Sequence, residues 1–201
     1  MYAGTVQEVR NEGYMISYDG YSAAYNETIP FGSKRLRAVG SAALEGVDYI
    51  AVERGKTSVR RGNLNTGKTL PLAWAALSSM ACFPATRFVE FEGNHVFYWV
   101  DLPARSEIFI TIKPLTGKRI NVYAYSGFDG KTLPPDVGSC VSCEAGYEAW
   151  SAAKPPKNFQ KSAGEHTIRL NAINNPYRVL IGVAGAKDVV EGDYELNISL
   201  K

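Results

Sequence analysis

The chain has 201 residues, 45% of them hydrophobic, and its 22 basic and 20 acidic side chains leave a formal net charge of +2. This length allows one large domain or two small ones, and this hydrophobic content is sufficient for a packed core. The balanced charge gives no indication of a nucleic-acid or membrane surface as partner, and no apolar run approaches the roughly 20 residues that a membrane-spanning helix needs.

The N-terminal residues bear on where the protein works. Residues 1–30 are polar and strand-like, so they are not a signal peptide. The sequence nevertheless starts inside an expected strand, which is what removal of a preceding segment would leave. We therefore leave the compartment open, with a weak preference for an extracellular or periplasmic location if an N-terminal signal has been removed.

The first forty residues contain four short segments with strand-like patterns, at 2–9, 13–18, 26–29 and 34–39. A turn is expected at Asp19-Gly20, because glycine tolerates positive φ. Tyr18 then closes one strand, Tyr21 lies on the loop, and Tyr25 opens the next strand. Aromatic side chains on two strand ends and the loop between them can face one point, which is how a small barrel builds a cage for a cation.

This stretch resembles the Tudor and chromo-barrel group of SH3-like barrels. The pattern is Tyr-x-Gly-aromatic-x-x-x-aromatic-Asn-Glu, and the resemblance covers about residues 2–38. Chromo barrels bind methylated lysine in an aromatic cage. The resemblance implies a ligand-binding site formed by Tyr2, Tyr18, Tyr21, Tyr25 and Glu27. The alternative is that some of these tyrosines pack the core or rim of the barrel.

Residues 40–70 are expected to be a connector, with one strand over Val47–Val52 and a series of basic side chains that we assign to a solvated loop. Gly62 to Thr69 matches the phosphate-loop pattern GxxxxGK[ST]. The context does not fit, because the residues before Gly62 are polar and basic and no alternation of strands and helices follows. We expect a Gly-Lys turn and no nucleotide binding.

Residues 71–201 have the pattern of an antiparallel β-sandwich. One short helix is expected at Pro71–Met80. Turn residues separate the expected strands, which are Thr86–Phe91, Asn94–Leu102, Glu107–Lys113, Arg119–Tyr125, Thr167–Asn171, Tyr177–Ala184 and Tyr194–Leu200.

This part resembles the bacterial pre-peptidase C-terminal domain group. The resemblance lies in the order of the strands and in the closing pattern, Asn-Pro-Tyr-Arg-Val-Leu-Ile-Gly-Val-Ala-Gly followed by Gly-Asp-Tyr-Glu-Leu. Domains of that group are non-catalytic sandwiches that are commonly attached to exported proteins. The resemblance implies an accessory role for this part of the chain.

Few residues offer catalytic chemistry. His95 lies in an apolar strand, where a packed histidine is expected, and no nucleophile-elbow pattern accompanies either histidine. A disulfide could form between two of Cys82, Cys140 and Cys143; free thiols, or a zinc site completed by a histidine, are the alternatives. We expect no catalytic residue, no metal and no cofactor.

The sequence thus predicts an all-β chain: a small Tudor-type barrel over 1–39, a connector over 40–70 and an antiparallel β-sandwich over 71–201. The predicted function is non-catalytic binding, in which the aromatic cage recognises a cationic side chain or peptide, methylated or not. The alternative is an exported structural or accessory protein for surface adhesion or assembly, with the barrel as scaffold.

Overall fold

The computed structural model describes residues 4–18, 20–30, 33, 47–76, 82–137, 142–147 and 164–201. The chain forms two compact units, Met1–Ala42 and Ala43–Lys201. Strands dominate both units, so the prediction of an all-β chain with an antiparallel sandwich is confirmed. No helix among these residues is long and apolar enough to span a membrane.

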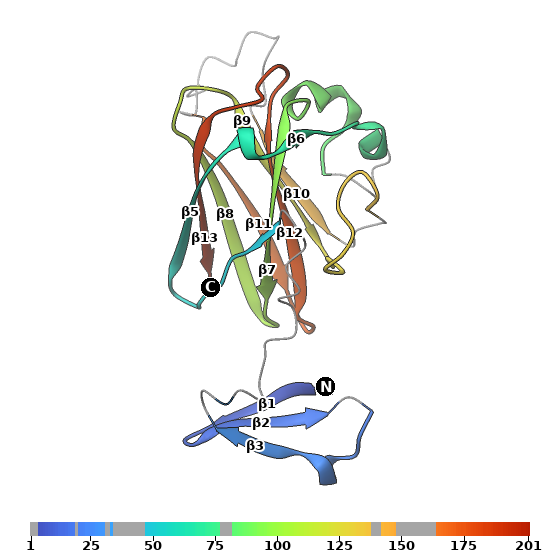
Figure 1. Cartoon of the computed structure of the whole chain (residues 1–201), viewed down its shortest axis with the longest axis vertical. Coiled ribbons are helices and arrows are strands. Elements are labelled where there is room, and N and C mark those ends of the chain that lie inside the picture. Colours follow the sequence, from blue (N-terminus) through green and yellow to red (C-terminus); the bar gives the residue numbers. More distant parts are fainter. Residues whose placement is uncertain are drawn as a thin grey trace. The chain divides into compact units, whose positions relative to one another are not determined.

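The first unit contains a three-stranded antiparallel sheet in the order β1-β2-β3 (Figure 1). Its elements are β1 (Gly4–Arg10), β2 (Gly13–Tyr18), the 3-10 helix η1 (Ala23–Tyr25) and β3 (Glu27–Pro30). Among its described residues, Ile16 and Ile29 are the buried apolar side chains. The described residues form an open sheet and not a closed barrel, and the fourth expected strand, at 34–39, lies outside them.

The second unit is a sandwich of two sheets. The larger sheet has the order β10-β9-β12-β7-β4, with β6 also paired to β7, and the smaller has the order β11-β8-β13-β5. Among the strands of the described residues, β4 and β7 are the one pair that runs parallel, and a single parallel bridge also joins Arg54 to Leu200. The strands are β4 (Val47–Tyr49), β5 (Thr57–Asn63), β6 (Lys68–Thr69), β7 (Asn94–Leu102), β8 (Ser106–Pro114), β9 (Ile120–Ser126), β10 (Cys143–Gly146), β11 (His166–Ala172), β12 (Tyr177–Gly185) and β13 (Asp193–Leu200).

Part of the expected connector belongs to the sandwich. Residues 47–69 supply β4, β5, the 3-10 helix η2 (Leu64–Thr66) and β6. The sequence of β5 is polar and basic because β5 is an edge strand that pairs with β13. Most of its side chains face solvent. Edge strands commonly carry such charges, which oppose unwanted pairing with other strands.

Three local elements differ from the sequence predictions. The helix expected over 71–80 is a 3-10 helix, η3 (Ala73–Ala76), in the described residues. The strand expected at Thr86–Phe91 is wrong: this segment forms the 3-10 helix η4 (Ala85–Glu90), which starts after Pro84. Apolar runs this short do not distinguish a strand from a helical turn. The short edge strand β10 was not predicted, because Cys-Glu-Ala-Gly has no strand signature.

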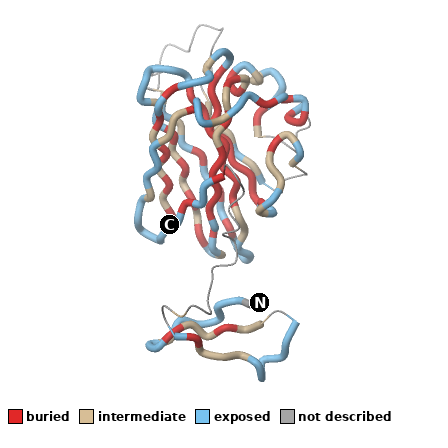
Figure 2. The backbone as a smooth tube through the Cα atoms, viewed as in Figure 1, coloured by how far each residue is buried: buried red, intermediate tan, exposed pale blue. Residues whose placement is uncertain are grey.

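Buried residues follow the strands of the second unit (Figure 2). Their apolar side chains form two separate clusters around the larger sheet. The first lies between the two sheets and is mainly aliphatic, with Val100, Leu102 and Ile110 at 0% exposure. The second covers the outer face of the larger sheet and is mainly aromatic. It joins strand residues to side chains from η3, η4 and neighbouring loops, and includes Trp74, Phe83, Phe91, Trp99, Tyr123 and Tyr125.

One buried hydrogen bond links the two sheets. The hydroxyls of Tyr98 on β7 and Tyr194 on β13 lie 2.8 Å apart. Burial raises the pKa of both phenols. A Cβ atom on Gly62 would lie 2.6 Å from the Tyr194 hydroxyl and 2.8 Å from that of Tyr98, so the pair requires glycine at this position on β5.

We predict that Tyr98→Phe lowers the free energy of unfolding of the sandwich by about 1–3 kcal/mol, because it leaves the Tyr194 hydroxyl buried without this partner. The double variant with Tyr194→Phe should cost less than the sum of the two single changes. Urea unfolding followed by tryptophan fluorescence measures this unit alone, since all three tryptophans lie in residues 43–201. Strictly additive costs would show that the two hydroxyls are not coupled.

Candidate functional site

The tyrosines of the first unit lie on the connection between β2 and β3. Tyr18 ends β2, and the Tyr21 N–H donates to the Tyr18 carbonyl at 3.1 Å. Gly20, with φ of +81°, allows this turn. Tyr25 ends η1 and does not open β3, which begins two residues later. The 3-10 turn brings the chain back, so the Tyr21 and Tyr25 side chains meet.

Tyr21 and Tyr25 form an exposed aromatic pair. Their ring centroids are 5.6 Å apart and their planes make an angle of 69°, an edge-to-face arrangement. Tyr21 is 51% exposed and Tyr25 is 63% exposed. Two rings at this angle form the walls of a corner that is open to solvent.

Tyr18 and Glu27 make the second contact of this region. The Tyr18 hydroxyl donates to the Glu27 carboxylate. Both side chains are half-buried, and the contact holds a negative charge at the start of β3, close in sequence to the tyrosine pair. Among the predicted site residues, the Tyr21 and Tyr25 rings are in contact, and Tyr18 is hydrogen-bonded to Glu27. Tyr2 lies outside the described residues.

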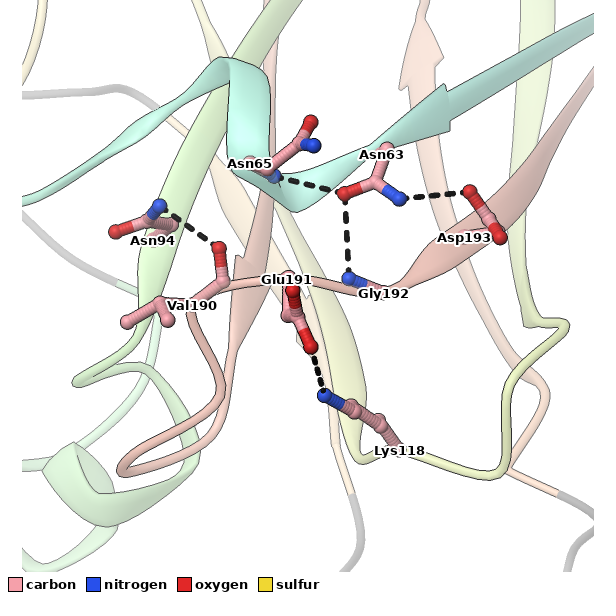
Figure 3. Close-up of polar contacts among 8 residues, drawn as sticks. All are labelled: Asn63, Asn65, Asn94, Lys118, Val190, Glu191, Gly192 and Asp193. Carbon is pink, nitrogen blue, oxygen red and sulfur yellow. Dashed lines mark hydrogen bonds and ion pairs between the residues drawn. The ribbon is translucent and has the colours of Figure 1, made fainter.

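The segment that matches the phosphate-loop pattern has a structural role at one end of the sandwich (Figure 3). The Asn63 side-chain carbonyl accepts from the N–H groups of Asn65 at 2.9 Å and Gly192 at 3.3 Å, and its amide donates to Asp193 at 2.7 Å. The Gly67 N–H donates to Leu64 O. The N–H groups of Asn65 and Gly67, which a phosphate loop would offer to a nucleotide, are therefore already bonded within the protein.

Both motif glycines are explained by packing. Gly62 makes room for the Tyr98 and Tyr194 hydroxyls, and a Cβ atom on Gly67 would lie 2.0 Å from the carbonyl oxygen of His95. Asn94 also links segments at this end of the sandwich. Its side-chain amide donates to the carbonyls of Leu64 at 3.1 Å and Val190 at 2.9 Å. Lys68 and Thr69 form β6 where a phosphate loop would start a helix.

His95 is locked inside the aromatic cluster. It is 2% exposed, its Nε2 lies 2.7 Å from the Phe91 carbonyl oxygen, and its Nδ1 lies 2.8 Å from the Tyr123 hydroxyl. Because a carbonyl only accepts, Nε2–H donates to Phe91 and the Tyr123 hydroxyl donates to Nδ1. Burial lowers the pKa of His95 to about 4, and the histidine is a neutral structural link, as predicted.

Glu90 and the cysteines adjoin the same outer face. Glu90 is fully buried, and its carboxylate lies 3.3 Å from the Arg119 guanidinium. The Cys82 thiol donates to the Ala124 carbonyl at 3.2 Å. Cys143 starts β10 and packs against the aromatic cluster. Cys140 lies outside the described residues, so which cysteines pair stays a prediction.

Within the described part of the chain, no group of three or more His, Cys, Asp or Glu side chains is placed to hold a metal.

Partly exposed side chains gather around the Trp99 ring, which is itself 4% exposed. The Tyr49 ring lies 4.5 Å from the Trp99 ring, and the Arg178 guanidinium lies 5.3 Å from that ring's centroid. The Asp101 carboxylate is 3.8 Å from Arg178. No sequence signal reveals this cluster, because its members come from β4, β7 and β12 and meet only through strand pairing.

No protein-family model matches the chain, and no characterised protein sequence matches it. Solved structures give distant likenesses. PliG of Aeromonas hydrophila, a periplasmic inhibitor of g-type lysozyme, is 9% identical with a TM-score of 0.37, covering 77% of this chain and 97% of its own. The pre-peptidase C-terminal domain of a Bacillus anthracis collagenase is 13% identical with a TM-score of 0.36, covering 77% and 94%.

A third likeness is to CorA, a surface-associated copper-binding protein of Methylomicrobium album. It is 8% identical with a TM-score of 0.39, covering 78% of this chain and 98% of its own. One of the three structures is a pre-peptidase C-terminal domain. Identities and TM-scores this low establish no family, so the function rests on the geometry of this chain.

We predict that the free energy of unfolding falls by up to about 3 kcal/mol between pH 7 and pH 4 because of His95. Its pKa of about 4 in the folded protein lies below the ordinary value of 6.5, so the unfolded chain takes up the proton first. Denaturant titrations across this range should show a smaller decline in His95→Gln than in the original protein. His166→Gln is the matched control, and an equal decline in the two variants would contradict the prediction.

We also predict that the Gly62–Thr69 segment binds no nucleotide. Calorimetry with magnesium and ATP should give no heat above dilution, in the original protein and in Lys68→Ala alike, because the loop N–H groups are bonded internally. A micromolar affinity that Lys68→Ala removes would show that this loop opens and binds phosphate.

Proposed function

We propose that the chain is a non-catalytic binding protein in which Tyr21, Tyr25 and Glu27 of the first unit take up a cationic group. The observation that carries the proposal is the edge-to-face pair of exposed rings. Rings left half or more exposed stabilise a small sheet little by burial, and the exposed part of each ring can meet a ligand.

The energetics favour a weak, cation-selective site. An exposed ring contributes about 0.5–1 kcal/mol to binding a cation, and more where water is excluded. Two rings and a nearby carboxylate then correspond to a dissociation constant on the order of 0.1–1 mM. The hydrogen bond from Tyr18 supports Glu27 in this role, because it restrains the carboxylate at the start of β3, two residues after Tyr25 in the sequence. A lysine, methylated lysine or arginine side chain of a protein or peptide fits this chemistry.

The buried titratable groups of the sandwich support a structural role for that unit. His95 uses both ring nitrogens within the aromatic cluster, and the Glu90 carboxylate faces Arg119. A neutral imidazole whose two nitrogens are both hydrogen-bonded inside the core is not positioned to exchange protons with a substrate.

A second candidate function is that of an exported accessory protein for surface adhesion or assembly. One observation favours it: the larger sheet is buried on both faces, which gives a stiff platform, while the outward side chains of the smaller sheet are half-buried or exposed. The extracellular or periplasmic location expected for such a protein belongs to this candidate and stays a prediction.

We predict that a peptide containing trimethyllysine shifts the Tyr21 and Tyr25 ring resonances in an NMR titration. Tyr21→Ala should abolish these shifts and change the melting temperature little, because this ring is half exposed. Tyr21→Phe should retain most of the binding, since it keeps the ring that attracts the cation. Glu27→Gln should weaken binding through loss of the negative charge.

Val9→Ala serves as the matched control, because Val9 is a 67% exposed side chain in the same unit, outside the pair. It should bind as the original protein does. If Tyr21→Ala instead unfolds the first unit, Tyr21 is a packing residue and the alternative reading of the tyrosines holds. Ring shifts that appear equally with an uncharged peptide would exclude a cation site.

A further inference from the structure

Two cysteines lie against the outer face of the larger sheet, where β10 pairs with β9. Cys82 precedes η4, and Cys143 is the first residue of β10. Both are present as thiols, both are half-buried, and both pack against the aromatic cluster. The fold thus brings two thiols that are distant in the sequence to the same face of one sheet.

Strand register fixes the position of Cys143, which lies directly opposite Tyr125 on β9. The Ser126 N–H donates to the Ser142 carbonyl at 2.9 Å, so those two residues form a hydrogen-bonded pair. Pairs alternate along antiparallel strands. Tyr125 and Cys143 therefore form a non-hydrogen-bonded pair, with Cα atoms about 4.5 Å apart and both side chains on one face. Because Tyr125 belongs to the aromatic cluster, that face is the outer one.

A hydrogen bond fixes the position of the Cys82 sulfur. The Cys82 thiol donates to the Ala124 carbonyl oxygen at 3.2 Å. Ala124 is paired with Glu144, the residue after Cys143. Backbone groups of alternate residues point to the same side of a strand, so the Ala124 carbonyl points to β10, as the Ser126 N–H does. The Cys82 sulfur therefore lies above the space between β9 and β10, on the face from which the Cys143 side chain projects.

Buried aromatic residues hold both thiols in this arrangement. Phe83, next to Cys82, is 2% exposed, and its ring stacks on Phe91 with the centroids 4.0 Å apart. Tyr125, opposite Cys143, is 4% exposed. A disulfide needs Cα atoms about 4.4–6.8 Å apart and Cβ atoms that face each other. Two thiols held over one strand pair approach this geometry by side-chain rotation.

We propose that Cys82 and Cys143 form a disulfide under oxidising conditions, and that this bond fastens the segment before η4 to the edge strand β10. The oxidant is a small disulfide or the disulfide of an oxidoreductase. One protein thiolate attacks that disulfide to form a mixed disulfide, and the second thiolate displaces the remaining thiol. The sulfur–sulfur bond of the oxidant breaks as that of the protein forms, and the two released thiols take up the two protons.

The bond joins two segments that have little regular backbone pairing of their own. β10 has four residues and pairs with β9 in the described part of the chain, and η3 and η4 are short 3-10 helices. A covalent link between these segments closes a long loop and removes conformational freedom from the unfolded chain, which stabilises the folded unit. The bond forms in the second unit, so it is independent of the proposed cation site in the first.

Thiol counting in the full chain and in two serine variants tests the proposal. Each protein is equilibrated in glutathione buffers of increasing oxidised fraction, denatured without reductant, labelled with N-ethylmaleimide and analysed by intact mass spectrometry. Since the chain has three cysteines, the oxidised original protein should carry one label, and Cys140→Ser, the matched control, should carry none. Cys143→Ser should still carry two labels at the glutathione ratio at which Cys140→Ser is half bridged.

Oxidation should also raise the melting temperature of Cys140→Ser, followed by tryptophan fluorescence, by about 5–10 °C, and should not raise that of Cys143→Ser. Two labels on fully oxidised Cys140→Ser would overturn the proposal. A bridge that forms in Cys143→Ser at the same or a less oxidising ratio would overturn it too, because Cys140 would then be the partner of Cys82. If Cys143→Ser does not fold, Cys140→Ser decides the outcome, because it retains only the proposed pair. A bridge that leaves the melting temperature unchanged would overturn the fastening role.

Discussion

The burial of both faces of the central strands β9, β12 and β7 of the larger sheet is the constraint on which the second unit depends. Every residue of β9 is buried, so its side chains must find apolar partners alternately between the sheets and on the outer face. Aromatic residues meet this requirement because each covers a large area. The Tyr123 ring lies so close to Gly182 on β12 that a Cβ atom there would be 2.2 Å from it. His95, hydrogen-bonded to Tyr123, is held in place by the same packing.

In this arrangement, the residues that stabilise the second unit are different from the side chains that are accessible to ligands. The aromatic cluster fixes η3, η4 and the neighbouring loops onto the larger sheet, and the aliphatic core fixes the smaller sheet against its inner face. His95, Glu90 and the Gly62–Thr69 segment contain residue types that can suggest a functional site, but here they contribute to packing. Side chains accessible to ligands lie elsewhere, on the open face of the smaller sheet and on the β2–β3 connection of the first unit.

The candidate cation site could be predicted from sequence only in part. The spacing of the tyrosines around a glycine turn correctly places Tyr18 at a strand end and Tyr21 on the connection that follows, but Tyr25 ends η1 and does not open β3 as predicted. The contact between Tyr21 and Tyr25 depends on the 3-10 turn of η1, which propensities do not indicate. The rows of polar side chains on the outer face of the smaller sheet could not be predicted, because they are set by register between strands as distant as β5 and β13. Each strand alone shows merely an ordinary alternation of polar and apolar residues.

The sequence by itself determined the all-β class of the chain and the approximate residue ranges of most long strands. It also determined which of their side chains point into the core and which point outward. These properties are local, since side-chain alternation and turn residues act over a few positions. Only the tertiary structure decided that residues 47–69 join the sandwich, that Thr86–Phe91 forms a 3-10 helix, and that the Gly62 and Gly67 positions serve packing. Those outcomes depend on contacts with residues distant in the sequence, such as Tyr194 against Gly62 and His95 against Gly67, which local patterns do not encode.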